Sequence, residues 1–149
     1  MATRKRRSRQ EKQEVTRVSM ALDPSLLARF DALVGRRGYA TRSEALRDLI
    51  RDELVHQQWS DNREVVGSIT LLYDHHTPGL GAQLTRQQHD AEADVLSALH
   101  VHLDHDHCLE VIVVRGPGKK VQKLADALIS VRGVLHGQLT STSLGQKIR

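Results

Sequence analysis

The chain has 149 residues, about the size of one domain, and 39% of them are hydrophobic but only 3% aromatic. Any core is therefore aliphatic and divided among small units. No apolar stretch approaches the roughly 20 residues of a membrane span, and no apolar segment follows the basic N-terminus as in a secretory signal. A single cysteine cannot form an intrachain disulfide, which fits the reducing cytoplasm. These features disfavour a membrane protein, a disulfide scaffold and a secreted protein.

Basic residues and histidines are unevenly distributed. Residues 1–12 hold six basic side chains and one acidic one, a net charge of +5. The whole chain has a net charge of +4, so the remaining residues together carry −1. We predict that residues 1–13 are a disordered basic arm. Eight of the nine histidines lie between His75 and His136. A basic N-terminus and a histidine-rich C-terminal part suggest two separate functions.

Residues 14–57 read as strand–helix–helix. Residues 15–22 alternate as a strand does, with Val18, Met20 and Leu22 on one face and Arg17, Ser19 and Ala21 on the other. Asp23-Pro24 predicts a helix start, and Gly35 or Gly38 its end. A second helix opens with a capping box at residues 41–44. The polar residues 58–63 read as a linker or as an extension of this helix.

This N-terminal unit needs a second chain. About 42 residues cannot bury enough apolar surface to be stable alone, and a single short strand leaves an unpaired edge. Both defects disappear if two chains pair their strands antiparallel and interlock their helices. The unit is therefore predicted to be an obligate dimer.

Residues 64–143 read as six elements in the order βαββαβ. Strands are expected at 65–73, 95–103, 108–115 and 134–142, and helices at 78–90 and from Gly118 to about residue 131. This order predicts a ferredoxin-like α+β fold, with both helices on one face of an antiparallel sheet. Residues 144–149 are predicted to be a flexible tail.

One hairpin concentrates the residues that can bind a metal. In a strand, His100 and His102 point to the same face, with Cα atoms about 6.6 Å apart at ~3.3 Å per residue. A short turn then brings Cys108 back beside them on the next strand. Two imidazoles and a thiolate are good ligands for a borderline transition metal, and the affinity should fall with acid because the ligands must lose their protons.

Each of these residues also has an ordinary interpretation. Histidines on a strand face are often solvated, and a free cysteine usually packs as a small hydrophobe. Only their convergence favours a metal site. His105 and His107 lie in the turn and are expected to be exposed and outside the site. His75 and His76 follow a strand end, where a surface role is favoured over that of secondary ligands.

Two blocks of residues resemble the nickel-responsive transcriptional regulators, which join a ribbon-helix-helix DNA-binding domain to an ACT-like metal-sensing domain. The first block is Arg36-Arg37-Gly38-Tyr39 followed by Arg42-Ser43-Glu44-Ala45. The second is the pattern H-x10-H-x-H-x5-C, which matches His89, His100, His102 and Cys108. Cys108-Leu109-Glu110 and Arg132-Gly133-Val134 also match. The resemblance spans about residues 15–142, and the basic arm is the one departure from the family pattern.

The resemblance implies the metal ligands. His100, His102 and Cys108 of one subunit and His89 of another would bind one Ni(II) per subunit in a square-planar site, with Glu110 orienting ligands through hydrogen bonds. Family members bind a further cation between the domains, through carboxylates that match Glu44 and Asp48. Glu44 is, however, already explained by the capping box.

The resemblance also implies how DNA is bound. Paired ribbon-helix-helix strands enter the major groove, which would bring Arg17 and Ser19 to the base edges, while Arg42 and Ser43 at the second helix's N-terminus would contact phosphate. The expected protein is a cytoplasmic homotetramer, a dimer of dimers, that binds palindromic operator half-sites when Ni(II) is bound. It would repress nickel-uptake genes. The basic arm is expected to add nonspecific DNA contacts.

Three rival functions are weaker. A repressor with an amino-acid-sensing ACT-like domain would leave the histidines and Cys108 unexplained. A metal enzyme would need an open coordination position and catalytic residues, and neither is evident, so no catalytic residue is predicted. A structural zinc site has the same ligand types, and copper exceeds nickel in intrinsic affinity, so the residues alone leave the metal open.

Overall fold

The computed structural model describes residues 15–146 and 148, so the predicted basic arm lies outside the described residues. The chain divides into two compact units, residues 1–42 and 43–149, and each is described separately. None of the helices in the described part of the chain is long and apolar enough to cross a membrane.

The first unit contains helix α1 (Pro24–Arg37), and its two ends follow from the sequence. The Asp23 carboxylate accepts hydrogen bonds from the backbone N–H groups of Ser25 and Leu26, at 3.0 and 2.9 Å. This is the predicted N-cap, which satisfies amides that have no partner within the helix. Gly38, rather than Gly35, closes the helix, because its φ of 73° is a left-handed conformation that glycine adopts without strain.

The strand predicted at 15–22 is not formed in the single chain. Residues 15–23 have no regular secondary structure, and the described residues supply no neighbouring strand. The apolar side chains of this segment are exposed, Val15 by 88%, Val18 by 82% and Met20 by 56%. The physical reason is that a strand needs a hydrogen-bonded partner, and the alternating pattern encodes only which face such a partner would cover.

The second helix extends beyond residue 57, where the predicted N-terminal unit ends. Helix α2 runs from Arg42 to Ser60, so residues 58–60 extend the helix instead of forming a linker. Its only buried residue is Ala45. Near its end, the Trp59 indole N–H donates to the Thr142 carbonyl at 2.9 Å, and Trp59 packs against the core of the sheet. This burial explains why the helix continues past the apolar stripe at its beginning.

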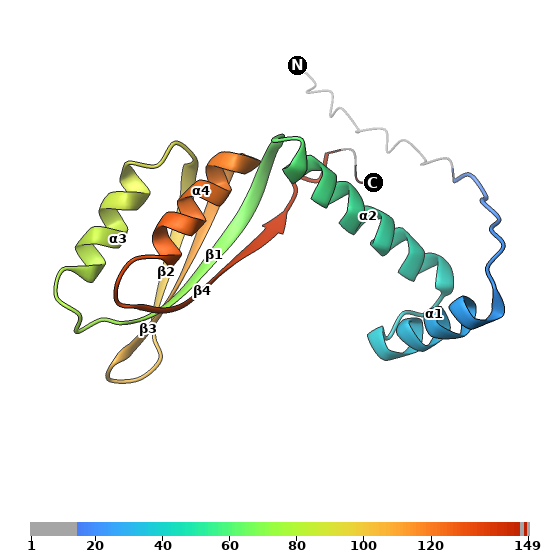
Figure 1. The fold of residues 1–149 in the computed structure, drawn as a ribbon, viewed down its shortest axis with the longest axis horizontal. Coiled ribbons are helices and arrows are strands. Elements are labelled where there is room, and N and C mark those ends of the chain that lie inside the picture. Colours follow the sequence, from blue (N-terminus) through green and yellow to red (C-terminus); the bar gives the residue numbers. More distant parts are fainter. Residues whose placement is uncertain (1–14, 147, 149) are drawn as a thin grey trace, which may run out of the picture. The chain divides into compact units, whose positions relative to one another are not determined.

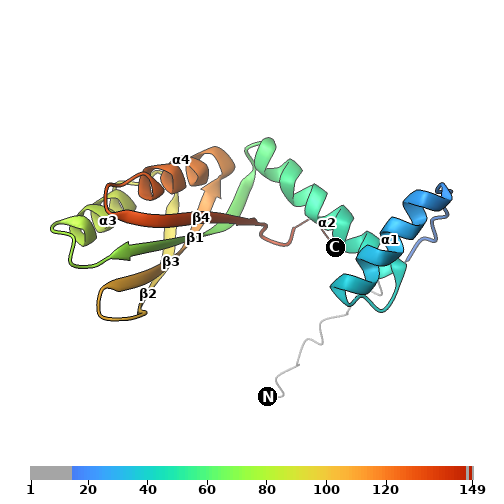
Figure 2. The ribbon, with the colours of Figure 1, turned by 60° about the horizontal axis from the view of Figure 1, so that its bottom comes forward.

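The second unit confirms the predicted βαββαβ order. Its strands are β1 (Glu64–Asp74), β2 (Asp94–His102), β3 (His107–Pro117) and β4 (Val134–Thr142), and its helices are α3 (Leu80–His89) and α4 (Gly118–Ile129). The strands form one antiparallel sheet in the order β2-β3-β1-β4. Both helices lie on the same face of this sheet, as Figure 1 and Figure 2 show. Among the described residues, β2 is therefore an edge strand that pairs only with β3.

The core lies between the sheet and its two helices. Alternate residues of β1 are buried, among them Ile69 and Leu71, as expected for a strand covered on one face. They pack with buried residues of the helices, such as Leu84, Val121 and Leu128. The opposite face of the sheet carries half-buried or exposed apolar side chains, namely Leu72, Leu99, Val101, Leu109, Val111 and Val113.

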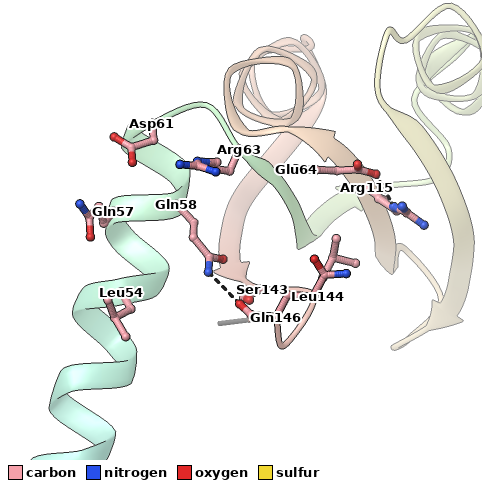
Figure 3. A pocket seen from close by; sticks show the side chains of 10 residues that line it. All are labelled: Leu54, Gln57, Gln58, Asp61, Arg63, Glu64, Arg115, Ser143, Leu144 and Gln146. Atoms are coloured by element: carbon pink, nitrogen blue, oxygen red, sulfur yellow. Dashed lines mark hydrogen bonds and ion pairs between the residues drawn. The ribbon is translucent and has the colours of Figure 1, made fainter. Parts of the chain in front are cut away.

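Residues 144–146 and 148, the described part of the predicted flexible tail 144–149, lie along α2. The Gln58 side chain donates to the Gln146 carbonyl at 3.2 Å, and Arg51 donates to the Ile148 carbonyl at 3.3 Å. Between this segment, the end of α2 and the sheet lies a pocket of about 450 Å³ (Figure 3). An ion pair between Glu64 and Arg115, at 2.6 Å, forms part of its lining. None of the described residues that line the pocket is a histidine or a cysteine, so it does not belong to the metal centre described below.

Candidate metal centre

The candidate centre is built on the β2–β3 hairpin. Its register pairs His102 directly with Cys108, and the His102 Nδ1 and Cys108 Sγ atoms are 3.2 Å apart. The turn between them is organised by Asp104, whose carboxylate accepts hydrogen bonds from the backbone N–H groups of Asp106 and His107 at 2.9 and 2.8 Å. Such an Asx turn holds the two strands at a fixed register. The hairpin therefore brings the imidazole and the thiol together without any further element.

His75 is a third donor beside this pair. It follows β1, and β1 is registered on β3 so that Tyr73 lies opposite Cys108. A backbone hydrogen bond of 3.1 Å from His75 to the Asp106 carbonyl ties the end of β1 to the hairpin turn. One donor atom from each of His75, His102 and Cys108 lies within 4.8 Å of the others. His75 is exposed, which agrees with the surface role expected from the sequence, but the structure also brings it to this cluster.

His100 lies next to this group but faces a second set of partners. Its ring centroid is 5.3 Å from that of His102, and its Nδ1 atom is 3.4 Å from the Tyr73 hydroxyl. Within the described residues, the cluster around Cys108 includes neither His100 nor His89. His89 is the exposed last residue of α3. Of the two remaining predicted ligands, His100 thus lies beside the cluster, and His89 is not part of it.

Glu110 connects the site to α3. It is the only buried charged residue among the described residues, and it lies opposite His100 in the hairpin register. Its carboxylate accepts hydrogen bonds from the Tyr73 hydroxyl at 3.0 Å and from the Gln88 amide at 2.9 Å. Burial, and then the Glu110 charge, raise the pKa of Tyr73, so Tyr73 remains a neutral donor. Glu110 therefore positions Tyr73, which contacts His100, and Gln88, which precedes His89 in the chain.

The environment of Cys108 favours the neutral thiol when no cation is present. Burial raises the pKa of Cys108, and the carboxylates of Asp104, Asp74 and Glu110 raise it further. A divalent cation would reverse this balance, because the same negative field stabilises the metal. For metal–ligand bonds of about 2.0–2.3 Å, neighbouring donor atoms lie roughly 3.0–3.5 Å apart. The distance of 3.2 Å between Nδ1 and Sγ fits this requirement.

The chemistry of the donor set narrows the choice of metal. One thiolate with imidazole nitrogens suits nickel, zinc and copper, and does not suit magnesium or calcium, which prefer oxygen. The residues present therefore fit a borderline transition metal. His105 and His107 are directed elsewhere, as expected for the turn. His107 pairs with Asp104 at 2.9 Å, and this contact raises the pKa of His107.

The predicted DNA-contacting residues lie on the first unit and at the start of α2. Arg17 and Ser19 are exposed in the irregular segment before α1. The Arg42 guanidinium instead forms a bidentate ion pair with the Asp31 carboxylate, with Nε–Oδ1 and Nη2–Oδ2 distances of 2.6 and 2.7 Å. This contact lowers the pKa of Asp31, and it joins the end of the loop after α1 back to α1. Ser43 is exposed in the first turn of α2.

Glu44 and Asp48, the carboxylates considered for a second cation, lie one turn apart in α2. The Asp48 carboxylate pairs with Arg51 of the same helix at 2.8 Å. Within the part of the chain that the structure describes, neither residue belongs to a cluster of three potential metal ligands.

Two known protein families match this chain, one in its N-terminal part and one in its C-terminal part. Residues 66–142 match the family described as NikR C terminal nickel binding domain, and residues 16–57 match ribbon-helix-helix proteins of the copG family. The chain belongs to the family of nickel-responsive regulators. It is 55% identical, over 136 residues, to a protein of Solibacter usitatus named as a nickel-responsive regulator. That match covers 91% of this chain and 98% of the relative.

Further relatives of this regulator family carry the same name. A protein of Nitratidesulfovibrio vulgaris is 52% identical over 89% of this chain and 96% of its own length. Another, of Geobacter sulfurreducens, is 50% identical over 91% of this chain and 98% of its own length. Among solved structures, the ACT domain from GTP pyrophosphokinase of Chlorobium tepidum is 16% identical, with a TM-score of 0.45, and covers 52% of this chain and 99% of that domain. The family is one of regulators and not of enzymes.

Proposed function

We propose that this nickel-responsive regulator is a repressor that binds operator DNA when Ni(II) occupies the C-terminal centre. The observation that carries the proposal is the buried thiol of Cys108 beside His102, at 3.2 Å, in a chain that also has a ribbon-helix-helix unit. A sensor needs a metal site in one part of the chain and a DNA-binding surface in another. Metal then acts through its different affinity for the states that do and do not bind DNA.

The proposed nickel ligands are His100, His102 and Cys108 of one subunit and His89 of another, with one Ni(II) per subunit. The hairpin register supports the pairing of His102 with Cys108, and the nearby His100 ring supports its addition. The exposed position of His89 at the end of α3 suits a ligand offered to another chain. A site completed by two chains would couple nickel binding to quaternary structure.

Nickel binding would displace the Cys108 proton, so the thiolate would be the ligand that distinguishes this site from one made only of histidines. His75 is an alternative ligand to His89 in this site, because one of its ring nitrogens lies within 4.8 Å of the donor atoms of His102 and Cys108. Glu110 would act as a positioning residue, through Tyr73 toward His100 and through Gln88 toward the end of α3. A further cation at Glu44 and Asp48 is the least supported part of the proposal.

The DNA-binding part of the proposal requires a second chain. Pairing residues 15–22 of two chains would cover Val18 and Met20, which are now exposed, and leave Arg17 and Ser19 free to reach base edges. The Ser43 backbone and the Arg42 side chain at the start of α2 would contact phosphate, Arg42 by exchanging or sharing its pairing with Asp31. The basic arm, residues 1–13, would add contacts that weaken with salt.

Two such dimers would join through the sensor domains into a homotetramer. The uncovered apolar face of the sheet, which includes Leu99 exposed by 61%, supports this association. A dimer of dimers would match palindromic half-sites, because the symmetry of the protein requires that of the DNA. The proposed targets are nickel-uptake genes, repressed in the cytoplasm when nickel is in excess.

A nickel titration of the reduced chain, beside Cys108→Ala, tests the metal site first. We expect a thiolate-to-nickel charge-transfer band in the near-ultraviolet that saturates at one Ni(II) per chain and is absent from the variant. His56→Ala is the matched control, because His56 is the one histidine outside the His75–His136 region. A band that persists in Cys108→Ala would overturn the ligand assignment.

DNA binding is then measured by selecting a random-sequence duplex pool on the full chain with and without Ni(II). We expect one palindromic sequence to be enriched only with Ni(II), and its affinity at fixed salt to rise at least tenfold, about 1.4 kcal/mol, across the titration. Cys108→Ala should show no such rise. An affinity for DNA that is the same at every nickel concentration would contradict the proposal.

A further inference from the structure

A second cluster of metal-ligating side chains lies outside the candidate nickel centre. Donor atoms of His76, His105 and Asp106 all lie within 4.8 Å of one another, and all three side chains are exposed. His76 follows β1, whereas His105 and Asp106 are in the turn between β2 and β3. None of the three belongs to the ligand set assigned above. We propose that these residues form a second, solvent-accessible site for a borderline divalent transition-metal ion.

The donor atoms face one another around the Asp106 carboxylate. One oxygen, Oδ1, is 3.5 Å from Nε2 of His76 and 2.8 Å from Nδ1 of His105. Metal–nitrogen and metal–oxygen bonds of about 2.0–2.2 Å place neighbouring donors roughly 3.0–3.5 Å apart. The His76 contact already has that separation, and a shift of a few tenths of an ångström in the exposed His105 ring provides the other. Metal binding at Nε2 of His76 and Nδ1 of His105 would replace the present contacts of these atoms with the His105 carbonyl and the Asp106 carboxylate, and each neutral ring would then carry its proton on its other nitrogen.

The two loops that supply the ligands are fixed to each other. His75 N–H donates to the Asp106 carbonyl at 3.1 Å, which ties the segment after β1 to the hairpin turn. The Asp74 carboxylate accepts the His76 N–H at 2.8 Å, and Asp104 holds the backbone of Asp106 at 2.9 Å. Metal binding therefore orders little more than two side-chain rings. A pre-arranged backbone lowers the entropic cost of binding.

The ligand types determine what the site binds. Two imidazoles and one carboxylate suit Zn(II), Ni(II) or Cu(II), with water filling the remaining positions. The site lacks a thiolate and is exposed, so it binds more weakly than the centre at Cys108. It is also adjacent to that centre, because the His75 and His76 rings are 4.0 Å apart between centroids and His75 belongs to the Cys108 cluster.

Equilibrium dialysis of the full chain against Ni(II) tests the second site, with the thiolate band followed on the same samples. We expect a weaker class of bound Ni(II), beyond the equivalent that produces the band. His105→Ala should lower the affinity of this weaker class at least tenfold, and Asp106→Asn several-fold, while the band and its saturation stay unchanged. His56→Ala, which removes an exposed histidine elsewhere, should change neither class.

X-ray absorption provides an independent readout, since the second equivalent should be surrounded by nitrogen and oxygen and not by sulfur. Binding that stops at one Ni(II) per chain would overturn the proposal. So would a weaker class that is indifferent to both substitutions at the cluster, or one that His56→Ala removes equally. This test is independent of the proposed repressor function: if the thiolate band were missing altogether, a weaker class sensitive to Asp106→Asn would still establish the second site.

Discussion

The two units of the chain differ in where they bury their apolar side chains. Helix α1 has no buried residue, and the segment before it exposes Val15, Val18 and Met20. The sheet unit, by contrast, buries a continuous set that includes Ile69, Leu84 and Leu128. Both have clear hydrophobic periodicity, so the difference does not come from pattern. The second unit folds its helices back over its own sheet, whereas the first has one layer and needs another chain to supply the second.

The largest expected effect comes from the closed core. Leu128→Ala removes a fully buried side chain of α4 and should destabilise the sheet unit by about 2–5 kcal/mol, since it combines lost burial with a cavity. Urea unfolding followed by far-ultraviolet circular dichroism measures this. Leu135→Ala, at a residue exposed by 59%, is the matched control and should change stability by less than about 0.5 kcal/mol. Equal effects at the two positions would mean that Leu128 is not part of the core.

The open face of the N-terminal segment should behave differently. Met20→Asp leaves the single chain unharmed, because Met20 is 56% exposed, but places a charge in the proposed strand pair. We expect DNA binding to be lost while the nickel–thiolate band is retained. Arg17→Ala is the companion variant, and should keep the dimer while losing about 1–3 kcal/mol of base discrimination. Sedimentation and DNA titration separate the two, and full DNA affinity in Met20→Asp would refute strand pairing.

A smaller effect is expected at Glu110, within the sheet unit. Glu110→Gln keeps the size of the side chain but weakens its acceptance of hydrogen bonds from Tyr73 and Gln88. Nickel affinity should fall roughly 10–100-fold, as is typical when an outer partner of metal ligands is changed, with the thiolate band still present. Competition with a chelator measures the affinity. Glu92→Gln, which alters an exposed carboxylate paired with Lys123, should leave it unchanged.

The smallest effect concerns pH in the N-terminal unit. The Arg42 guanidinium lowers the pKa of Asp31, so this pair contributes stability above the ordinary Asp pKa, and the contribution is lost as pH falls through the lowered value. Both side chains are exposed, so the contribution is minor. Thermal unfolding between about pH 2 and 5 should show a slightly shallower acid dependence for Asp31→Asn than for the wild-type chain. A steeper dependence in the variant would contradict this sign.

Local signals in the sequence predicted most of the elements. Asp23-Pro24 and Gly38 bound α1 because capping depends only on neighbouring residues, and strand alternation located the four strands to within about two residues. The short turn at Asp104 made the pairing of His102 with Cys108 predictable, since a hairpin joins neighbours in the chain. The ligand set built around that pair stays a prediction.

Contacts between distant segments were decided only by the tertiary structure. His75 reaches Cys108 because β1 pairs with β3 in a register that places Tyr73 opposite Cys108, and nothing near His75 in the chain encodes that register. Likewise, Trp59 extends α2 because it packs on the sheet. Residues 15–22 show what a local sequence pattern cannot determine. Their alternation specifies a strand face, but a strand forms only where a partner supplies its hydrogen bonds, and the single chain has none for it among the described residues.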